Sequence, residues 1–199
     1  MTHSLFAQPQ TWCLPDADLS YWPGFLSAQE ADFYLHTLQS SLAWQQDSIR
    51  LFGEFRKIPR LQAWYGDQGV AYSYSGTRLT ASHWTPALES LRDRIEQATG
   101  HRFNSVLANL YRDGNDSMGW HADDEPELGD NPVIVSLTLG ETRDFKLRHK
   151  TSKDQVKIAL SSGSLLIMAG ATQHCWQHSI AKSRKPCGVR INLTFRRVF

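Results

Sequence analysis

The chain has 199 residues, of which 41% are hydrophobic and 21% are charged, and its formal net charge at pH 7 is +1. This length suffices for one substantial core, so we predict a single domain over residues 21–199, and we expect a monomer. Because no apolar run is long enough to cross a bilayer and residues 1–5 do not open a signal peptide, we expect neither a membrane protein nor a secreted one. The three cysteines are odd in number and lack a C-x-x-C pair, which argues against a disulfide framework or a structural zinc site and favours a reducing cytoplasm, or the nucleus in a eukaryote.

A first helix is predicted after residues 1–20, a segment that we expect to be irregular. Ser27 followed by Glu30 three residues later is the capping-box pattern that opens a helix. Apolar side chains then recur at approximately helical spacing, at Phe33, Leu35, Leu38 and Leu42.

A second helix has signals at both of its ends. Thr85 is a typical cap, Pro86 suits the first turn and Gly100 ends the pattern. Between them, an apolar stripe is formed by Leu88, Leu91 and Ile95.

From residue 104 onward the pattern changes to strands. Short segments rich in strand-forming residues, separated by turn residues, lie at 133–139, 145–148, 156–160, 164–168 and 189–197. Helices followed by a run of strands predict an α+β fold, in which the strands close into a two-sheet jelly roll.

Two histidines and one carboxylate form a candidate metal site. His121 and Asp123 lie on one face of an extended segment, about 7 Å apart at the backbone, so their side chains can converge on one ion. His178 would come from elsewhere in the fold as the third ligand. If its segment is extended, His174 lies roughly 13 Å from it, so the two cannot both bind. Two histidines and a carboxylate suit iron(II) in non-haem oxygenases and leave three positions open. A His-x-Asp pair alone is more often structural, so this interpretation depends on the last strand.

The last strand combines four polar and three apolar side chains in strict alternation. Residues two apart on a strand share a face, so one face carries Arg190, Asn192, Thr194 and Arg196. The opposite face carries Ile191, Leu193 and Phe195. Two guanidiniums on one wall suit a ligand with a carboxylate at each end, although spacing alone leaves open which arginine meets which carboxylate.

These motifs together resemble the AlkB family of iron(II)/2-oxoglutarate dioxygenases. The resemblance covers about residues 51–199 and is carried by Asn109-Leu110-Tyr111-Arg112-Asp113-Gly114, by His121-Ala122-Asp123-Asp124-Glu125, by Gly163-Ser164-Leu165-Leu166-Ile167-Met168 and by 190–196. It implies a double-stranded β-helix, with iron(II) held by His121, Asp123 and His178. Molecular oxygen and 2-oxoglutarate would be co-substrates, with the latter bound by Arg190 and Arg196 and by hydrogen bonds from a set comprising Asn109, Tyr111, Asn192 and Thr194.

The activity implied by the resemblance is oxidative demethylation of alkylated bases. The motifs are closest to the animal members that repair alkylation damage in DNA, with bases of the N1-methyladenine and N3-methylcytosine type as substrates. The alternatives are the same chemistry on RNA, on protein or on a small molecule, or a binding module for nucleic acid that has lost turnover.

Substrate contacts are predicted at several further positions. Tyr72 and Tyr74 share parity and suit an aromatic wall against a base, although such pairs are often only cross-strand packing. Asp124 and Glu125 would favour a cationic methylated base, unless they belong to a solvated acidic loop. Phe52 is a candidate for a wedge inserted into the base stack where the base leaves, and the alternative is a buried strand residue. Arg60 is the final candidate.

The segment around Arg60 resembles duplex-acting members, whereas the acidic block resembles a member that favours single strands. Strand preference therefore stays open.

Charge is divided unevenly along the chain. Residues 143–199 contain 12 Lys/Arg against 2 Asp/Glu, whereas residues 1–142 contain 9 against 18. Phosphates are therefore expected near the basic third, at Lys146, Arg148, Lys150, Lys153, Lys157, Lys182, Arg184 and Lys185. The alternative is that these are ordinary solvated strand faces and loops.

Overall fold

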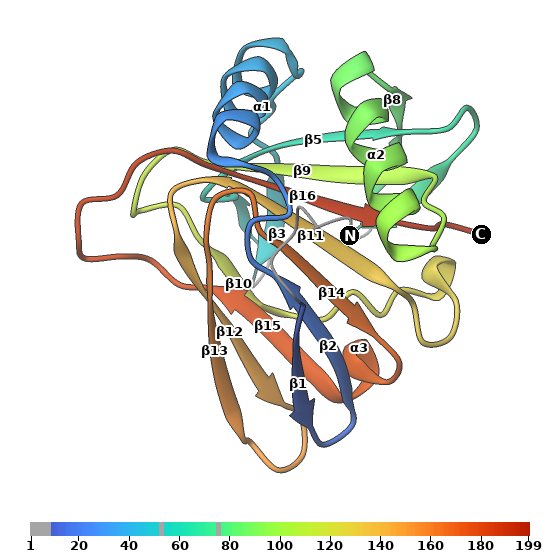
Figure 1. Cartoon of the computed structure of the whole chain (residues 1–199), viewed down its shortest axis with the longest axis vertical. Coiled ribbons are helices and arrows are strands. Elements are labelled where there is room, and N and C mark those ends of the chain that lie inside the picture. Colours follow the sequence, from blue (N-terminus) through green and yellow to red (C-terminus); the bar gives the residue numbers. More distant parts are fainter. Residues whose placement is uncertain (1–8, 52–53, 75–76) are drawn as a thin grey trace, which may run out of the picture.

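Two β-sheets packed face to face form the centre of the molecule (Figure 1). The computed structural model describes residues 9–51, 54–74 and 77–199. The larger sheet contains, in spatial order, β1 (Gln10–Leu14), β2 (Ala17–Trp22), β14 (Leu165–Ala169), β11 (Ile134–Gly140), β16 (Arg190–Arg196), β9 (Ser105–Tyr111), β5 (Leu61–Gly66) and β8 (Ser82–His83). The smaller sheet contains β10 (Met118–His121), β15 (Trp176–Ile180), β12 (Arg143–His149) and β13 (Gln155–Leu160). Neighbouring strands are antiparallel except β5 and β8, and the predicted jelly roll is confirmed.

Strand β16 divides its side chains between two buried layers, as the alternation in its sequence predicts. Ile191, Leu193 and Phe195 are fully buried in the apolar layer between the larger sheet and the helices. The opposite face of β16 points into the space between the two sheets. This alternation places four polar side chains inside the roll, where they build the site described below.

The two predicted helices, α1 (Ala28–Ser41) and α2 (Pro86–Thr99), lie side by side over the larger sheet (Figure 1). The capping box of Ser27 and Glu30 is present at the start of α1. Thr85 caps α2, and Gly100 ends it with a φ of 75°, a left-handed conformation that glycine adopts without strain. Each cap contributes about 1 kcal/mol to helix stability.

The prediction that Phe33 belongs to the buried apolar stripe of α1 is wrong. Phe33 is 62% exposed, whereas Ala31 and Leu38 are buried against the sheet. Successive helical residues are rotated by about 100°, so Phe33 lies nearly opposite Leu35 and cannot share its buried face.

The expectation of an irregular N-terminus is also wrong for the described part of residues 1–20. β1 and β2 form a hairpin there, and β2 pairs with β14 in the larger sheet. Leu19 and Tyr21 of β2 are buried in the core between the sheets, and Asp16 turns the chain with a φ of 54°. Pro15 lies in that turn, so it indicates a strand boundary rather than irregular structure.

Smaller elements connect this framework. Two hairpins are formed by β3 (Ser48–Leu51) with β4 (Glu54–Lys57) and by β6 (Ala71–Tyr74) with β7 (Thr77–Thr80), and two short helices are η1 (Pro126–Leu128) and α3 (Thr172–Cys175). Phe52 lies outside the described residues. Tyr72 and Tyr74 lie in β6, but their side chains are not among those described. Within the described ranges, no helix is both long and apolar enough to span a bilayer, and all three cysteines are free thiols.

The start of α1 carries a pH-dependent contact that can be tested. A hydrogen bond from Arg94, followed by those from Ser27, lowers the pKa of the Glu30 carboxyl from its ordinary value of 4.5 to about 2. A lowered folded-state pKa gives stability that is complete above pH 4.5 and is lost as the pH falls toward 2. We therefore expect Glu30→Gln to lower the melting temperature at pH 7 and to have a shrinking effect below pH 4.5. An equal effect of the substitution at pH 7 and pH 2.5 would contradict this linkage.

Candidate active site

The structure brings His121, Asp123 and His178 together between the sheets. Their candidate ligand atoms all lie within 4.8 Å of one another. His121 ends β10 and is the cross-strand partner of His178 in β15, so sheet pairing places the two rings 4.2 Å apart. Asp123 follows two residues after β10, with its Oδ1 atom 3.9 Å from Nε2 of His121. His174 lies in α3 and is exposed, away from this group.

The ionisation of Asp123 and His178 suits metal binding. Burial raises the pKa of the Asp123 carboxyl, but the charges of Arg196 and the two histidines outweigh it, so the pKa falls to about 2. Burial, followed by the charge of His121, lowers the pKa of His178 to about 3. At neutral pH the group therefore offers a carboxylate and an uncharged imidazole, the forms that coordinate metals.

The hydrogen bond of His121 also fits a metal ligand. Its Nδ1 atom lies 2.9 Å from the carbonyl oxygen of Gly119. A carbonyl only accepts, so Nδ1 carries the hydrogen and Nε2 keeps a free lone pair directed to the other two ligands. Two imidazoles and one carboxylate are a donor set that fits iron(II).

The polar face of β16 forms the opposite wall of the cavity. Arg196 is buried, and its Nη2 atom donates to Oδ1 of Asp123 at 2.9 Å. Arg190 is also buried, and its Nη2 atom donates to Oδ1 of Asn192 at 2.7 Å and to Oγ1 of Thr138 at 3.1 Å. The remaining member of this face, Thr194, accepts from the Asn192 amide.

Arg190 has hydrogen-bonding capacity left over. Burial lowers the pKa of its guanidinium to about 10, so it remains charged at neutral pH. Its Nε and Nη1 atoms are buried and have no acceptor in hydrogen-bond geometry among the described residues, although the Tyr111 side chain also favours the charged guanidinium. Unsatisfied buried donors are costly, and a carboxylate supplies the kind of acceptor that they lack. This is the fit expected for a dicarboxylate co-substrate.

Strand β9 brings the remaining predicted co-substrate contacts to the same cavity. Tyr111 is the cross-strand partner of Arg190, and Asn109 is the partner of Asn192. Both line the cavity with the metal-ligand group and β16. Asn109 is held by Arg60, whose Nε atom donates to its Oδ1 atom at 2.9 Å.

The structure shows which groups surround Arg60, Asp124 and Glu125, for which substrate contacts are predicted. Arg60 is only 4% exposed and contacts Asn109 rather than lining the cavity, so it supports the wall from behind. The Asp124 carboxylate accepts a hydrogen bond from Nζ of Lys150 at 2.9 Å, and the two side chains form an ion pair at the surface. Glu125 is half-buried immediately before η1. For Arg60 and Asp124, tertiary contacts that residue type does not reveal determine where the side chain points.

The cavity also contains residues that the sequence interpretation missed. Ser136 donates to Oδ1 of Asn192 at 2.9 Å, and the ring of Phe145 stacks on His178 at 5.1 Å. Further wall residues are Leu107, Met118, Met168, Ser179 and Ile180. A signal for Ser136 was present, because Ser136 and Thr138 alternate with apolar residues in an otherwise apolar strand.

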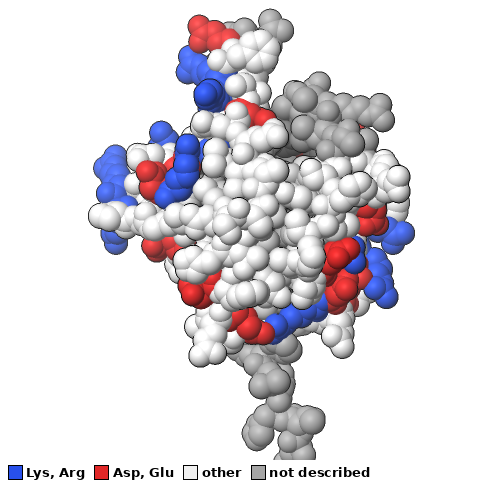
Figure 2. Space-filling view, turned by 90° about the horizontal axis from the view of Figure 1, so that it is seen from above, with Lys and Arg blue, Asp and Glu red and all other residues white. Residues whose placement is uncertain are grey.

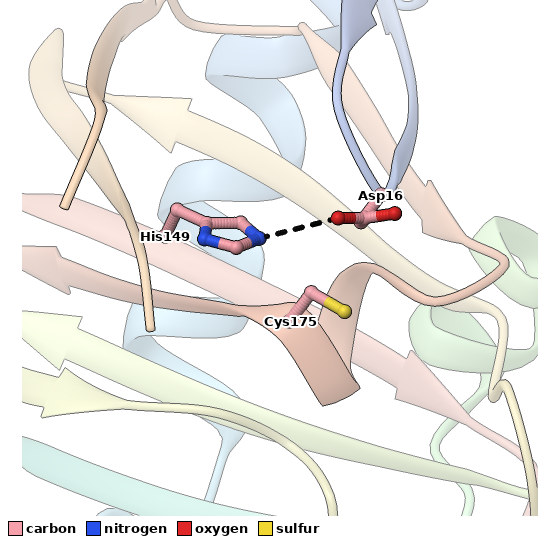
Figure 3. Close-up of side chains that lie close together, drawn as sticks. All are labelled: Asp16, His149 and Cys175. Atoms are coloured by element: carbon pink, nitrogen blue, oxygen red, sulfur yellow. Dashed lines mark ion pairs between the residues drawn. The ribbon is translucent and has the colours of Figure 1, made fainter. Parts of the chain in front are cut away.

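Asp16, His149 and Cys175 form a second group with metal-ligating side chains (Figure 3). The Nδ1 atom of His149 accepts from the backbone N–H groups of Thr151 at 3.2 Å and Ser152 at 3.0 Å. Nδ1 therefore carries no hydrogen, so the neutral ring has its hydrogen on Nε2, which faces the Asp16 carboxylate at 3.4 Å. A metal ion would need a lone pair on Nε2, so this arrangement fits a structural contact between two turns instead.

This structural interpretation of His149 gives a prediction. We expect His149→Leu to lower the free energy of unfolding by about 1 to 3 kcal/mol, because two turn N–H groups lose their acceptor. Chemical denaturation measures this change, and manganese(II) binding at the first group should be unaffected. Loss of a bound metal equivalent in this variant would show that the second group is a metal site after all.

Comparisons with known proteins agree with the geometry of the first group. A family model described as the 2OG-Fe(II) oxygenase superfamily matches residues 18–196. The chain is 46% identical over 192 residues to human alpha-ketoglutarate-dependent dioxygenase alkB homolog 3, covering 89% of this chain and 65% of that protein. It is 39% identical over 192 residues to human DNA oxidative demethylase ALKBH2, covering 91% of this chain and 73% of that protein. The chain belongs to the AlkB family of 2OG-Fe(II) oxygenases.

Solved structures support the same fold. The structure of OsALKBH1 superimposes with a TM-score of 0.68 at 19% identity, covering 94% of this chain and all of that one. The AlkB-family membership implies iron(II), 2-oxoglutarate and molecular oxygen as cofactor and co-substrates, in agreement with the sequence prediction. The chain spans slightly less than two thirds of the alkB homolog 3 relative.

Proposed function

We propose that this AlkB-family chain is an iron(II)/2-oxoglutarate-dependent dioxygenase that oxidatively demethylates alkylated bases in DNA. The observation that carries the proposal is one cavity holding two complementary sites. A group suited to iron(II), His121, Asp123 and His178, faces a buried Arg190 with two open donors. A protein that only binds nucleic acid needs neither site, which argues against the alternative of a non-catalytic module.

The two arginines have different roles in this proposal. Arg196 contacts the ligand Asp123, so the carboxylate that it binds is the one beside the metal. Arg190 lies six residues earlier on the strand, on the same face, and its open donors bind the far carboxylate. The two arginines would then hold the co-substrate between them along β16.

The residues of the chain hold the reactants while the bound group performs the oxidation. Iron(II), 2-oxoglutarate and oxygen supply the oxidising chemistry when bound, converting the co-substrate to succinate and carbon dioxide. Asp123 and the two histidines would hold the metal, a donor set that leaves coordination positions for the co-substrate and oxygen. The hydroxylated methyl group leaves as formaldehyde, which releases the unmodified base.

Nucleic acid is the proposed partner, and its phosphates are placed at the exposed basic residues. The ALKBH2 relatives are named as DNA oxidative demethylases. Of the 12 Lys/Arg in residues 143–199, Arg143, Arg190 and Arg196 are buried, and the eight predicted phosphate contacts are partly or fully exposed. On the face that carries the helices, acidic and basic side chains are mixed around an uncharged centre (Figure 2). We place the phosphate contacts where these eight residues lie, on β12 and β13 with the turn between them and on the 181–185 loop.

Incubation with methylated oligonucleotides tests the proposal. Single-stranded and duplex DNA and RNA carrying N1-methyladenine or N3-methylcytosine are treated with the protein, iron(II), ascorbate and 2-oxoglutarate, and then analysed by mass spectrometry. We expect loss of the methyl group from DNA, dependent on 2-oxoglutarate. If only the RNA oligonucleotides lose the methyl group, RNA is the substrate and the DNA proposal is wrong. If no oligonucleotide changes in mass and no succinate forms, the whole proposal is refuted.

A further inference from the structure

Asp123 is the one member of the metal-ligand group that lies outside a strand. His121 and His178 belong to β10 and β15, whereas residues 122–125 have no regular structure. The backbone N–H of Asp123 donates instead to the side-chain Oε1 of Gln173 at 3.0 Å. Asp123 is 2% exposed and Gln173 is 1% exposed, so this bond is shielded from water.

Several contacts hold Gln173 in place. It lies in α3 next to Thr172, whose hydroxyl accepts from the backbone N–H of Asp18 at 2.9 Å and donates to the carbonyl of Ala169 at 2.6 Å. The Nε2 atom of Gln173 contacts the sulfur of Met168 at 3.5 Å. The orientation of the amide is therefore determined, because the reverse orientation would direct an N–H donor at the N–H of Asp123.

A second, weaker connection runs through Lys150. Its Nζ atom donates to the carboxylate of Asp124 at 2.9 Å and to the backbone carbonyl of Gln173 at 3.0 Å. The Lys150 and Asp124 side chains are 31% and 53% exposed, and exposed ion pairs contribute little. The buried amide of Gln173 is therefore the stronger of these two constraints on the ligand segment.

We propose that Gln173 is a positioning residue that holds Asp123 where its carboxylate can bind the metal. The inference rests on the proposed function, because it takes His121, Asp123 and His178 as the iron(II) ligands. Arg196 fixes the carboxylate from one side, and Gln173 fixes the backbone from the other. Without the amide oxygen, the irregular segment loses its buried anchor and the carboxylate moves relative to the two histidines.

Manganese(II) binding, followed by loss of the free-ion paramagnetic resonance signal, tests this role without relying on turnover. Gln173→Met keeps the length of the side chain but removes the acceptor, and we expect its dissociation constant to rise about 10-fold or more. Gln173→Glu retains an acceptor oxygen and should keep most of the affinity. Gln46→Met is the matched control. It makes the same substitution away from the metal group, where the Gln46 amide donates to the carbonyl of Ile58 at 2.9 Å.

The outcomes separate the positioning role from the proposed function. Absence of manganese(II) binding by the unmodified protein would refute the proposed function and the positioning role with it. Binding by the unmodified protein and equally tight binding by Gln173→Met would refute the positioning role alone. A lower melting temperature at unchanged affinity would likewise show that Gln173 is only structural. If Gln173→Met does not fold, Gln173→Asn, whose shorter amide cannot reach Asp123, is compared with Gln173→Glu instead.

Discussion

Replacing His178 with alanine is expected to abolish demethylation and to weaken manganese(II) binding strongly. His178 offers an uncharged imidazole in a buried site, and His121 is the one other histidine in this group of described residues. Losing it leaves two ligands, His121 and Asp123, which cannot hold one side of the ion. The fold should persist, because His178 occupies the cavity wall rather than the apolar layer under the helices.

His174→Ala is the matched control for this variant. His174 lies four residues earlier, in α3, and its side chain is exposed. We expect near-normal turnover and metal affinity. Melting curves of both variants establish that any loss reflects the site rather than unfolding. Full activity of His178→Ala would remove His178 from the ligand group.

The second large effect is expected on 2-oxoglutarate affinity in Arg190→Ala. Truncating one partner of a desolvated charge pair costs on the order of 2 to 5 kcal/mol, which corresponds to a dissociation constant raised about 30-fold or more. The protein without co-substrate should change little in melting temperature, because the substitution also removes two unsatisfied buried donors. The rise in melting temperature that 2-oxoglutarate produces in the unmodified protein should disappear.

Arg190→Lys provides the conservative comparison. A lysine keeps the positive charge but presents no planar pair of N–H donors, so affinity should be intermediate. Titration calorimetry measures all three proteins. An unchanged dissociation constant in Arg190→Ala would place the far carboxylate elsewhere and would reverse the roles assigned to Arg190 and Arg196.

The two candidate metal groups differ in the hydrogen bond that one histidine in each, His121 or His149, makes through Nδ1. Nδ1 of His121 faces a carbonyl, which leaves Nε2 free to coordinate. Nδ1 of His149 faces two N–H groups, which places the hydrogen on Nε2. Both groups contain residues of the right types within 4.8 Å. Residue type and proximity therefore do not define a metal site unless the second hydrogen bond has the right direction.

The sequence alone determined the elements whose signals are local. The caps of both helices depend on residues within four positions of each other, so they are legible without the fold. The alternation along β16 likewise follows from strand geometry, and it correctly assigned Arg190 and Arg196 to the face opposite Ile191. Motif spacing also indicated the family, which the comparisons confirmed.

Only the tertiary structure decided which polar residues support the site. Gln173 lies 50 positions from Asp123, and Arg60 lies 49 positions from Asn109, so no local pattern announces either contact. Asp124 was predicted from its charge to lie near a substrate, but its contact with Lys150, 26 positions away, could not be predicted from the sequence. The N-terminal hairpin likewise becomes regular because β2 pairs with β14. In each case a partner distant in sequence sets the direction of the side chain or backbone, and that partner comes close only when the chain has folded.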